Sequence, residues 1–153
     1  MKLQKAEKDD IEILSELWHK LAKGMEQYSE LNELKDNAKK ESRNGFSKLL
    51  KDEDTTIFLL EVEDKVAGYM ILQEGEHPSK THEKYIPIVD LFVEEEHRGQ
   101  GYGTEMMEKA EEYTERQDCD HLKVSVEVRN TEARKFYEKN GYRQKKVRYV
   151  KEL

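Results

Sequence analysis

The feature that most constrains this chain is an apolar run that ends in a glycine-rich turn. The run reads Val-Asp-Leu-Phe-Val over residues 89–93, and residues 98–104 follow as Arg-Gly-Gln-Gly-Tyr-Gly-Thr. Glycines between a strand and a helix let the backbone approach a ligand closely. A helix that begins near Tyr102 would also turn free N–H groups and its positive dipole end toward an anion. Because Arg98 adds donors suited to phosphate, the stretch predicts a pyrophosphate-binding turn.

Three phosphate-binding motifs compete for this stretch. A P-loop requires Lys and then Ser or Thr after its last glycine, but Thr104 and Glu105 stand there. A dinucleotide fingerprint requires Gly or Ala at Thr104, although Asp118 and Asp120 lie at a suitable distance for a ribose contact. The third motif, Arg-x-x-Gly-x-Gly from Arg98, is similar to the acetyl-CoA signature of the GNAT superfamily of N-acetyltransferases. The second and third interpretations both remain open at this point.

Composition limits the class of protein. The 153 residues suffice for one domain with a real core, and the net charge of −7 argues against a nucleic-acid binder and favours a cationic partner. No apolar run approaches the ~18 residues of a membrane span, and the first residues lack the apolar core of a signal peptide. The single cysteine, Cys119, excludes an internal disulfide and is typical of a reducing cytoplasm. The five histidines show no metal-ligand spacing, so we expect no metal site.

Apolar periodicity predicts an α/β chain with a mixed, twisted sheet and helices on both faces. The expected order is β-α-α-β-β-β-α-β-α-β, with six to seven strands and a right-handed crossover after the fourth. Gly68 inside a strand predicts a bulge or a close approach of two backbones. The expected strands are residues 3–7, 56–62, 66–72, 85–93, 121–128 and one or two within 142–150. The expected helices are residues 11–24, 31–50 with a break near Gly45, 102–117 and 131–140.

A second motif favours the acetyl-CoA interpretation. From Asn130 to Tyr142 the chain reads Asn-x-x-Ala-x-x-Phe-Tyr-x-x-x-Gly-Tyr. This pattern resembles the second signature of the GNAT superfamily, and it follows the glycine motif at the spacing that the family shows. The resemblance covers residues 56–145 well. It implies a single N-acetyltransferase domain over residues 1–153, with a mostly antiparallel GNAT-like sheet and acetyl-CoA as co-substrate.

The resemblance also implies a site by position. Leu91, Phe92 and Val93 would offer backbone groups to the acetyl carbonyl and the pantetheine arm, and Asn130 would hydrogen-bond that arm. Tyr137 would lie near the thioester sulfur as a general acid. The ordinary pKa of a tyrosine, about 10, exceeds the value of about 8.5 for a thiol. General acid catalysis of this kind contributes on the order of 10²–10⁴ in rate. The pyrophosphate would be held chiefly by the main-chain N–H groups of Arg98, Gly99, Gln100, Gly101, Tyr102, Gly103 and Thr104.

The general base departs from the family pattern. In the histone-acetylating branch a glutamate lies four residues before the position that matches Leu91, and here that position is Pro87. Asp90, Glu74 on the neighbouring strand, or a water molecule could replace it, and we take Asp90. Trp18 and Tyr28 are candidates to line the acceptor pocket.

The sequence therefore predicts an N-acetyltransferase that acts by direct attack in a ternary complex. The acceptor would be a small-molecule or exposed protein amine, cationic in charge, with no nucleic acid or membrane as partner. A homodimer is compatible with this prediction. The alternative is a non-catalytic acyl-CoA-binding or regulatory module on the same fold, and the presence of Tyr137 favours the enzyme.

Overall fold

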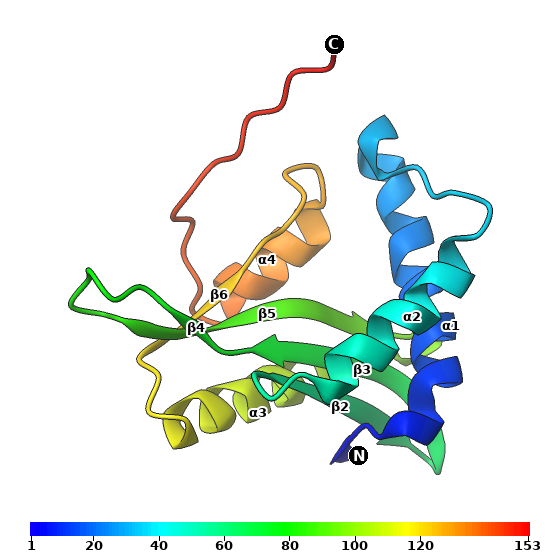
Figure 1. Cartoon of the computed structure of the whole chain (residues 1–153), viewed down its shortest axis with the longest axis horizontal. Helices are drawn as coiled ribbons and strands as arrows, with labels where there is room; N and C mark the ends of the chain where they lie inside the picture. Colours follow the sequence, from blue (N-terminus) through cyan, green and yellow to red (C-terminus); the bar gives the residue numbers. More distant parts are fainter.

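The sheet is the centre of the molecule, which is a computed structural model that describes all of residues 1–153. Its strands lie in the order β1-β2-β3-β5-β4, and β6 pairs with the other side of β5 (Figure 1). All neighbours are antiparallel except β5 and β6, which are parallel. The strands are β1 (Lys2–Lys5), β2 (Thr55–Val62), β3 (Lys65–Gln73), β4 (Gly75–Glu76), β5 (Lys84–Val93) and β6 (His121–Val124).

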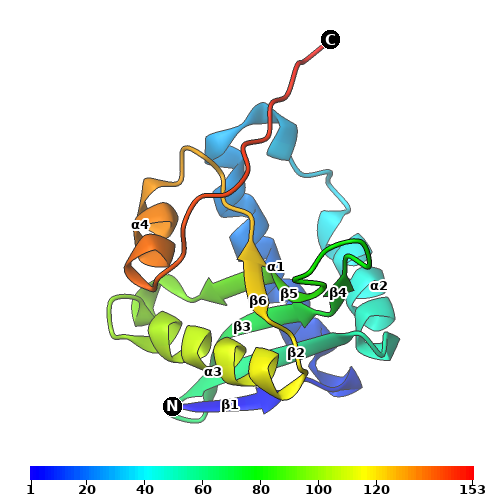
Figure 2. The same cartoon turned by 90° about the vertical axis from the view of Figure 1, so that its left-hand side faces the viewer.

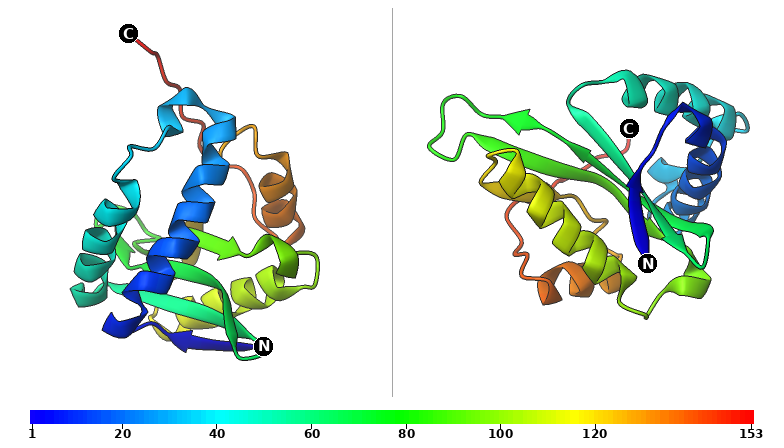
Figure 3. Two further views of the ribbon diagram at one scale, coloured as in Figure 1. Left: turned by 90° about the vertical axis from the view of Figure 1, so that its right-hand side faces the viewer. Right: turned by 90° about the horizontal axis from the view of Figure 1, so that it is seen from below.

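Four helices cover the two faces of this sheet. Helices α1 (Ile11–Met25) and α2 (Ala38–Lys51) lie on one face, and α3 (Tyr102–Arg116) and α4 (Thr131–Lys139) lie on the other (Figures 2 and 3). The predicted mixed, mostly antiparallel sheet with helices on both faces is confirmed. None of the helices combines the length and the apolar character that crossing a membrane requires. Short 3-10 turns lie at Lys8–Asp10, Glu26–Tyr28, Glu30–Asn32 and Glu95–His97.

Alternation along β2 and β3 creates two separate cores. Side chains on a strand point to opposite faces in turn, so each strand supplies both cores. One core packs against α1 and α2, and the other packs mainly against α3. The first receives Ile57, Leu59, Tyr69 and Ile71, and the second receives Phe58, Leu60, Met70 and Leu72.

The β2–β3 hairpin has a tight turn, and it confirms the prediction for Gly68. Glu63 and Asp64 form its tight turn with φ of 52° and 63°, the left-handed values of a two-residue hairpin turn. Gly68 marks a close approach, because a Cβ built there would lie 2.3 Å from the carbonyl oxygen of Phe92. The strand register also shifts beside it, between Leu60 and Glu61 of β2.

A bulge in β5 decides which face carries its later side chains. In the pairing with β3, Leu72 lies opposite Ile88 and Ile71 lies opposite Asp90, so Val89 is an extra residue. Before the bulge, Ile88 faces the α3 side, whereas after it Phe92 faces α1 and α2. A one-residue insertion reverses the facing of everything that follows. The sequence predicts this strand but not its interruption.

Three predicted extents are wrong. The second helix begins only at Ala38, after a separate 3-10 turn, and runs through Gly45 without a break. Strand β6 ends at Val124 instead of Val128, because β5 pairs with it only as far as Ile88. The closing strand within 142–150 is absent, and the outer edge of β6 has no neighbouring strand.

Candidate active site

A gap opens between β5 and β6 where their pairing stops. The two strands pair from Tyr85 to Ile88 of β5, and beyond the bulge that side of β5 has no neighbouring strand. Backbone groups along Leu91–Val93 on this side are therefore available to an extended ligand. A cavity of about 340 Å³ lies where the strands part, lined by Pro87, Ile88, Val89, Lys123, Val124 and Ser125.

The glycine turn presents backbone donors to open space. Gly99 and Gly101 have φ of 75° and 88°, and a Cβ built at either position would meet no atom within 4 Å. The first backbone bond of α3 runs from the Glu105 N–H to the Gly101 carbonyl, 3.1 Å, so the N–H groups of residues 102–104 lack helical partners. This geometry fits the binding of a phosphate group. Gly103 also has a packing role, because a Cβ there would lie 3.1 Å from the Phe136 ring.

Arg98 holds the corner between β5 and this turn. Its Nε donates to the Val93 carbonyl oxygen at 2.8 Å, and its guanidinium lies 5.5 Å from the centre of the Phe92 ring. The side chain thus fixes the end of the strand while its charge stays beside the glycine turn. Gln100 is exposed, and its side-chain amide lies 3.4 Å from the Glu96 carbonyl oxygen.

Asp90 is held by a buried tyrosine. The fully buried Tyr69 donates a hydrogen bond of 2.8 Å from its hydroxyl to Oδ2 of Asp90. Burial raises the pKa of Asp90, and the bond from Tyr69 opposes that effect. Burial and the Asp90 charge also raise the pKa of Tyr69 far above its ordinary value, so Tyr69 remains a donor. Asp90 is therefore a carboxyl group of raised pKa with a fixed orientation.

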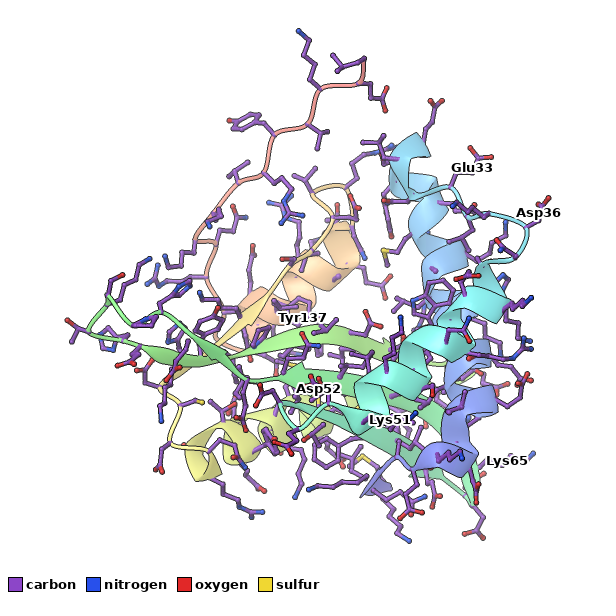
Figure 4. All side chains as sticks on the ribbon, in the orientation of Figure 1. Glu33, Asp36, Lys51, Asp52, Lys65 and Tyr137 are labelled. Atoms are coloured by element: carbon purple, nitrogen blue, oxygen red, sulfur yellow. The ribbon has the colours of Figure 1, made fainter.

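Tyr137 and Asn130 come from α4 on the other side of the sheet. The Asn130 side chain accepts from the Ala133 N–H at 3.1 Å and so caps helix α4. Tyr137 projects toward the sheet (Figure 4) and packs edge-on against Tyr142, with ring centres 5.7 Å apart. Burial raises the pKa of Tyr137 to about 12, and the charge of Asp90 contributes to the rise. The structure thus brings Tyr137 and Asp90 close enough to interact electrostatically.

A larger cavity of about 600 Å³ lies on the α1–α2 side of β5. Its apolar lining comprises Trp18, Leu34, Ala38, Phe46, Leu49, Ile71 and Val89. Asp90 is the one charged residue of the lining that is not exposed, whereas Glu33, Lys35 and Glu41 are exposed. Glu33 belongs to the segment between α1 and α2 (Figure 4). Val89 lines this cavity as well as the smaller one, so both cavities border the bulge.

Two other suggested residues lie elsewhere. Tyr28 does not line the larger cavity, although its carbonyl oxygen accepts from Arg129 at 3.2 Å. Glu74 lines neither cavity; burial, and after it the charge of Glu74, raise the pKa of the Cys119 thiol. No three His, Cys, Asp or Glu side chains gather where they could hold a metal ion.

Sequence reasoning missed Tyr69 and the role of the bulge. The available signal was a tyrosine hydroxyl within the apolar run Val-Ala-Gly-Tyr-Met-Ile-Leu, since a buried hydroxyl requires a partner. That signal does not identify the partner. Phe46, whose ring packs edge-on against Tyr69 at 6.1 Å, was expected only as part of a helix face.

Comparison with known proteins agrees with this geometry. Residues 14–142 match the family described as acetyltransferase (GNAT) family. An uncharacterized N-acetyltransferase of Archaeoglobus fulgidus is 27% identical over 137 residues, which cover 90% of this chain and 89% of the relative. One from Methanocaldococcus jannaschii, MJ1207, is 29% identical over 140 residues, which cover 92% of this chain. That match spans only 59% of the length of the M. jannaschii protein.

Solved structures show the same fold at low sequence identity. A tetramutant of the BH1408 protein from Bacillus halodurans has a TM-score of 0.83 at 21% identity, with both chains fully covered. A predicted acetyltransferase from Clostridium acetobutylicum, solved with acetyl-CoA, has a TM-score of 0.79 at 16% identity. The match covers 99% of this chain and 95% of the C. acetobutylicum chain. With the glycine turn, the parted strands and the family match in agreement, the chain belongs to the GNAT acetyltransferase family.

Proposed function

We propose that the chain transfers the acetyl group of acetyl-CoA to a primary amine by direct attack in a ternary complex. The observation that carries this proposal is that two cavities border the bulge, with Val89 in both linings. One cavity adjoins the strand gap and the other opens on the α1–α2 side. Two substrates that enter from opposite sides of β5 would therefore meet beside Asp90.

The chain's own residues suit the co-substrate on the gap side. The N–H groups after Gly101 would hold the pyrophosphate, and the open space beyond Gly99 and Gly101 leaves room for it. Backbone groups of Leu91–Val93 would align the pantetheine arm, with Asn130 at the other wall. Acetyl-CoA supplies an activated thioester. A backbone N–H in the gap would stabilise the charge that develops on its carbonyl oxygen.

Asp90 would act as the general base. Ionised Asp90 attracts an ammonium group, accepts one of its protons and leaves a nitrogen lone pair for attack on the acetyl carbon. Its raised pKa makes it a better proton acceptor than an exposed aspartate. As the carbon–nitrogen bond forms and the carbon–sulfur bond breaks, Tyr137 would give its proton to the departing thiolate.

Protonation of Asp90 would prepare Tyr137 for its role. A pKa of about 12 keeps the Tyr137 hydroxyl protonated at neutral pH, as an acid must be, but lies above the thiol value of about 8.5. The Asp90 charge is one cause of that high pKa. When Asp90 takes the proton of the amine, this cause disappears and Tyr137 becomes the stronger acid. The base step therefore assists the acid step.

The larger cavity favours a cationic acceptor with an apolar portion. Its inner surface combines apolar side chains with Asp90, and its exposed residues Glu33 and Glu41 outnumber Lys35. The apparent KM for the amine should rise as salt shortens the Debye length from ~10 Å at 0.1 M to ~3 Å at 1 M. Glu41→Gln should raise the apparent KM for the amine at low salt only. Glu108→Gln on the outer side of α3 should leave this KM unchanged.

A screen of amines with acetyl-CoA, monitored by thiol release, tests the proposal. We expect turnover with at least one cationic amine and a loss of 10²-fold or more in Asp90→Asn. Acetyl-CoA binding without turnover of any amine would instead favour the non-catalytic module. A neutral or acidic best substrate would contradict the proposed acceptor.

A further inference from the structure

The segment between α1 and α2, residues 26–37, forms the outer wall of the larger cavity. Four of its residues line that cavity: Glu33, Leu34, Lys35 and Asn37. Figures 1 and 3 show the end of α1 and the first part of this segment extending beyond the strands. The shape of the cavity therefore depends on what holds the segment in place.

Bonds within the segment shape it locally. The Leu34 N–H donates to Oε2 of Glu26 at 3.0 Å. The side chain of Asn32 donates from Nδ2 to the Met25 carbonyl oxygen, also at 3.0 Å. Both bonds join neighbours in the chain, so they do not set the position of the segment relative to the strands.

Two further hydrogen bonds join this segment to the part of the chain that follows β6. Nδ2 of Asn32 also donates to Oε1 of Glu127 at 2.8 Å, and both side chains are half-buried. The guanidinium of Arg129 donates to the Tyr28 carbonyl oxygen at 3.2 Å. The partners lie 95 and 101 residues apart in the sequence, so these two bonds, here called the bridge, fix the segment by tertiary contact.

The turn that receives the bridge also belongs to the cofactor side of the site. The carbonyl oxygen of Glu127 accepts from the Asn130 N–H at 2.9 Å, which closes the turn 127–130 at the start of α4. In the proposed complex, Asn130 also binds the pantetheine arm. One short turn therefore holds the wall of the acceptor cavity on one side and would contact acetyl-CoA on the other.

We propose that Asn32, Glu127 and Arg129 are positioning residues that couple the two substrate sites. Acetyl-CoA bound at Asn130 stabilises the turn 127–130, and through the bridge this turn stabilises the wall of the larger cavity. The amine should accordingly bind the acetyl-CoA complex more tightly than it binds the free chain, and by linkage each substrate tightens the other equally. Both substrate positions are those of the proposed function, on which this coupling rests.

Hydrogen exchange tests the coupling without an acceptor. The backbone N–H groups of residues 31–34 all donate within the segment, so their exchange reports its local stability. Saturating acetyl-CoA should slow this exchange about tenfold in the wild type, and less than about twofold in the double variant Glu127→Ala, Arg129→Ala. Residues 102–104, beside the proposed pyrophosphate, should be protected equally in both proteins.

The two sets of amides separate the possible failures. Protection of residues 102–104 without protection of residues 31–34 in the wild type overturns the coupling and leaves the proposed function intact. Protection of neither set overturns the proposed cofactor site as well. Equal protection of residues 31–34 in the wild type and the double variant shows that the bridge does not carry the coupling, and so refutes the roles of Glu127 and Arg129.

Steady-state kinetics separates coupling from a general loss of structure. With the amine of highest turnover and saturating acetyl-CoA, Glu127→Ala and Arg129→Ala should each raise the KM for the amine about tenfold, with kcat and melting temperature little changed. Glu127→Gln keeps the accepting Oε1 and should retain the low KM. Arg43→Ala is the matched control, because Arg43 also joins two segments, through Glu12 at 2.8 Å, but at the opposite end of α1. An equal rise of KM in Arg43→Ala, or no rise in either bridge variant, overturns the proposal.

Discussion

The hydrogen bond from Tyr69 to Asp90 makes a quantitative prediction for Tyr69→Phe. The substitution keeps the ring that packs against Phe46 and Phe92 and removes only the hydroxyl. That hydroxyl stabilises the ionised form of Asp90, so its loss should raise the pKa of Asp90. A hydrogen bond to a charged group contributes about 1.5–3 kcal/mol, and one pKa unit corresponds to about 1.4 kcal/mol. The acidic limb of the pH profile should therefore move upward by about 1–2 pH units.

The assay is kcat/KM for the amine as a function of pH, measured by thiol release. Activity should fall most at low pH and recover above the new midpoint. Tyr113→Phe is a matched control, because the Tyr113 hydroxyl shares a 2.9 Å hydrogen bond with Thr56 and its ring packs edge-on against Phe58. It should leave the midpoint in place. An unchanged profile in folded Tyr69→Phe would show that the acidic limb does not report Asp90.

Three further predictions concern the same site. Tyr137→Phe should lower kcat by roughly 10²-fold with little change in acetyl-CoA affinity, and a kcat within about a factor of three in single-turnover measurements would make Tyr137 a packing residue. Gly101→Ala meets no neighbour but forces a left-handed conformation that costs about 1–2 kcal/mol. It should weaken acetyl-CoA binding in calorimetry by roughly tenfold, whereas Gly24→Ala in α1 should not. Because the fold raises the pKa of Asp90, its contribution to stability is full at low pH and declines as pH rises through that pKa. The melting temperature of Asp90→Asn should accordingly rise relative to that of the wild type as pH rises from 3 to 7. A difference between the two melting temperatures that does not change with pH would exclude a raised pKa.

Much of the fold could be predicted because local patterns determine it. Alternation in β2 and β3 survives in the structure because both faces of these strands are buried, so each residue has only one suitable face. Gly68 was informative for a similar reason, since only a residue without Cβ fits beside the Phe92 carbonyl. The glycine turn was recognisable because its function depends on backbone geometry, which Gly99 and Gly101 specify directly.

The parts of the site that were not predicted depend on relations between distant segments. Nothing near Tyr69 indicates that Asp90 is its partner, because the pairing follows from the register of β3 against β5. The end of β6 at Val124 is likewise set by β5, which diverges after Ile88. The alternating Val-x-Val-x-Val of residues 124–128 fits a strand perfectly well, but a strand also needs a neighbour.

At the bulge, the presence of an extra residue at position 89 matters more than which side chain that residue carries. The Val89 side chain is 46% exposed, so many residues should be tolerated there. Its deletion would leave Asp90 opposite Ile71 and facing α1 and α2, because Ile88 and Asp90 already lie opposite consecutive residues of β3. The deletion would instead remove the local bend that a bulge gives a strand, at the point where β5 and β6 part. In evolution or in the laboratory, this position should accept substitutions freely and reject a single-codon deletion, since the extra residue bends the strand whatever its side chain.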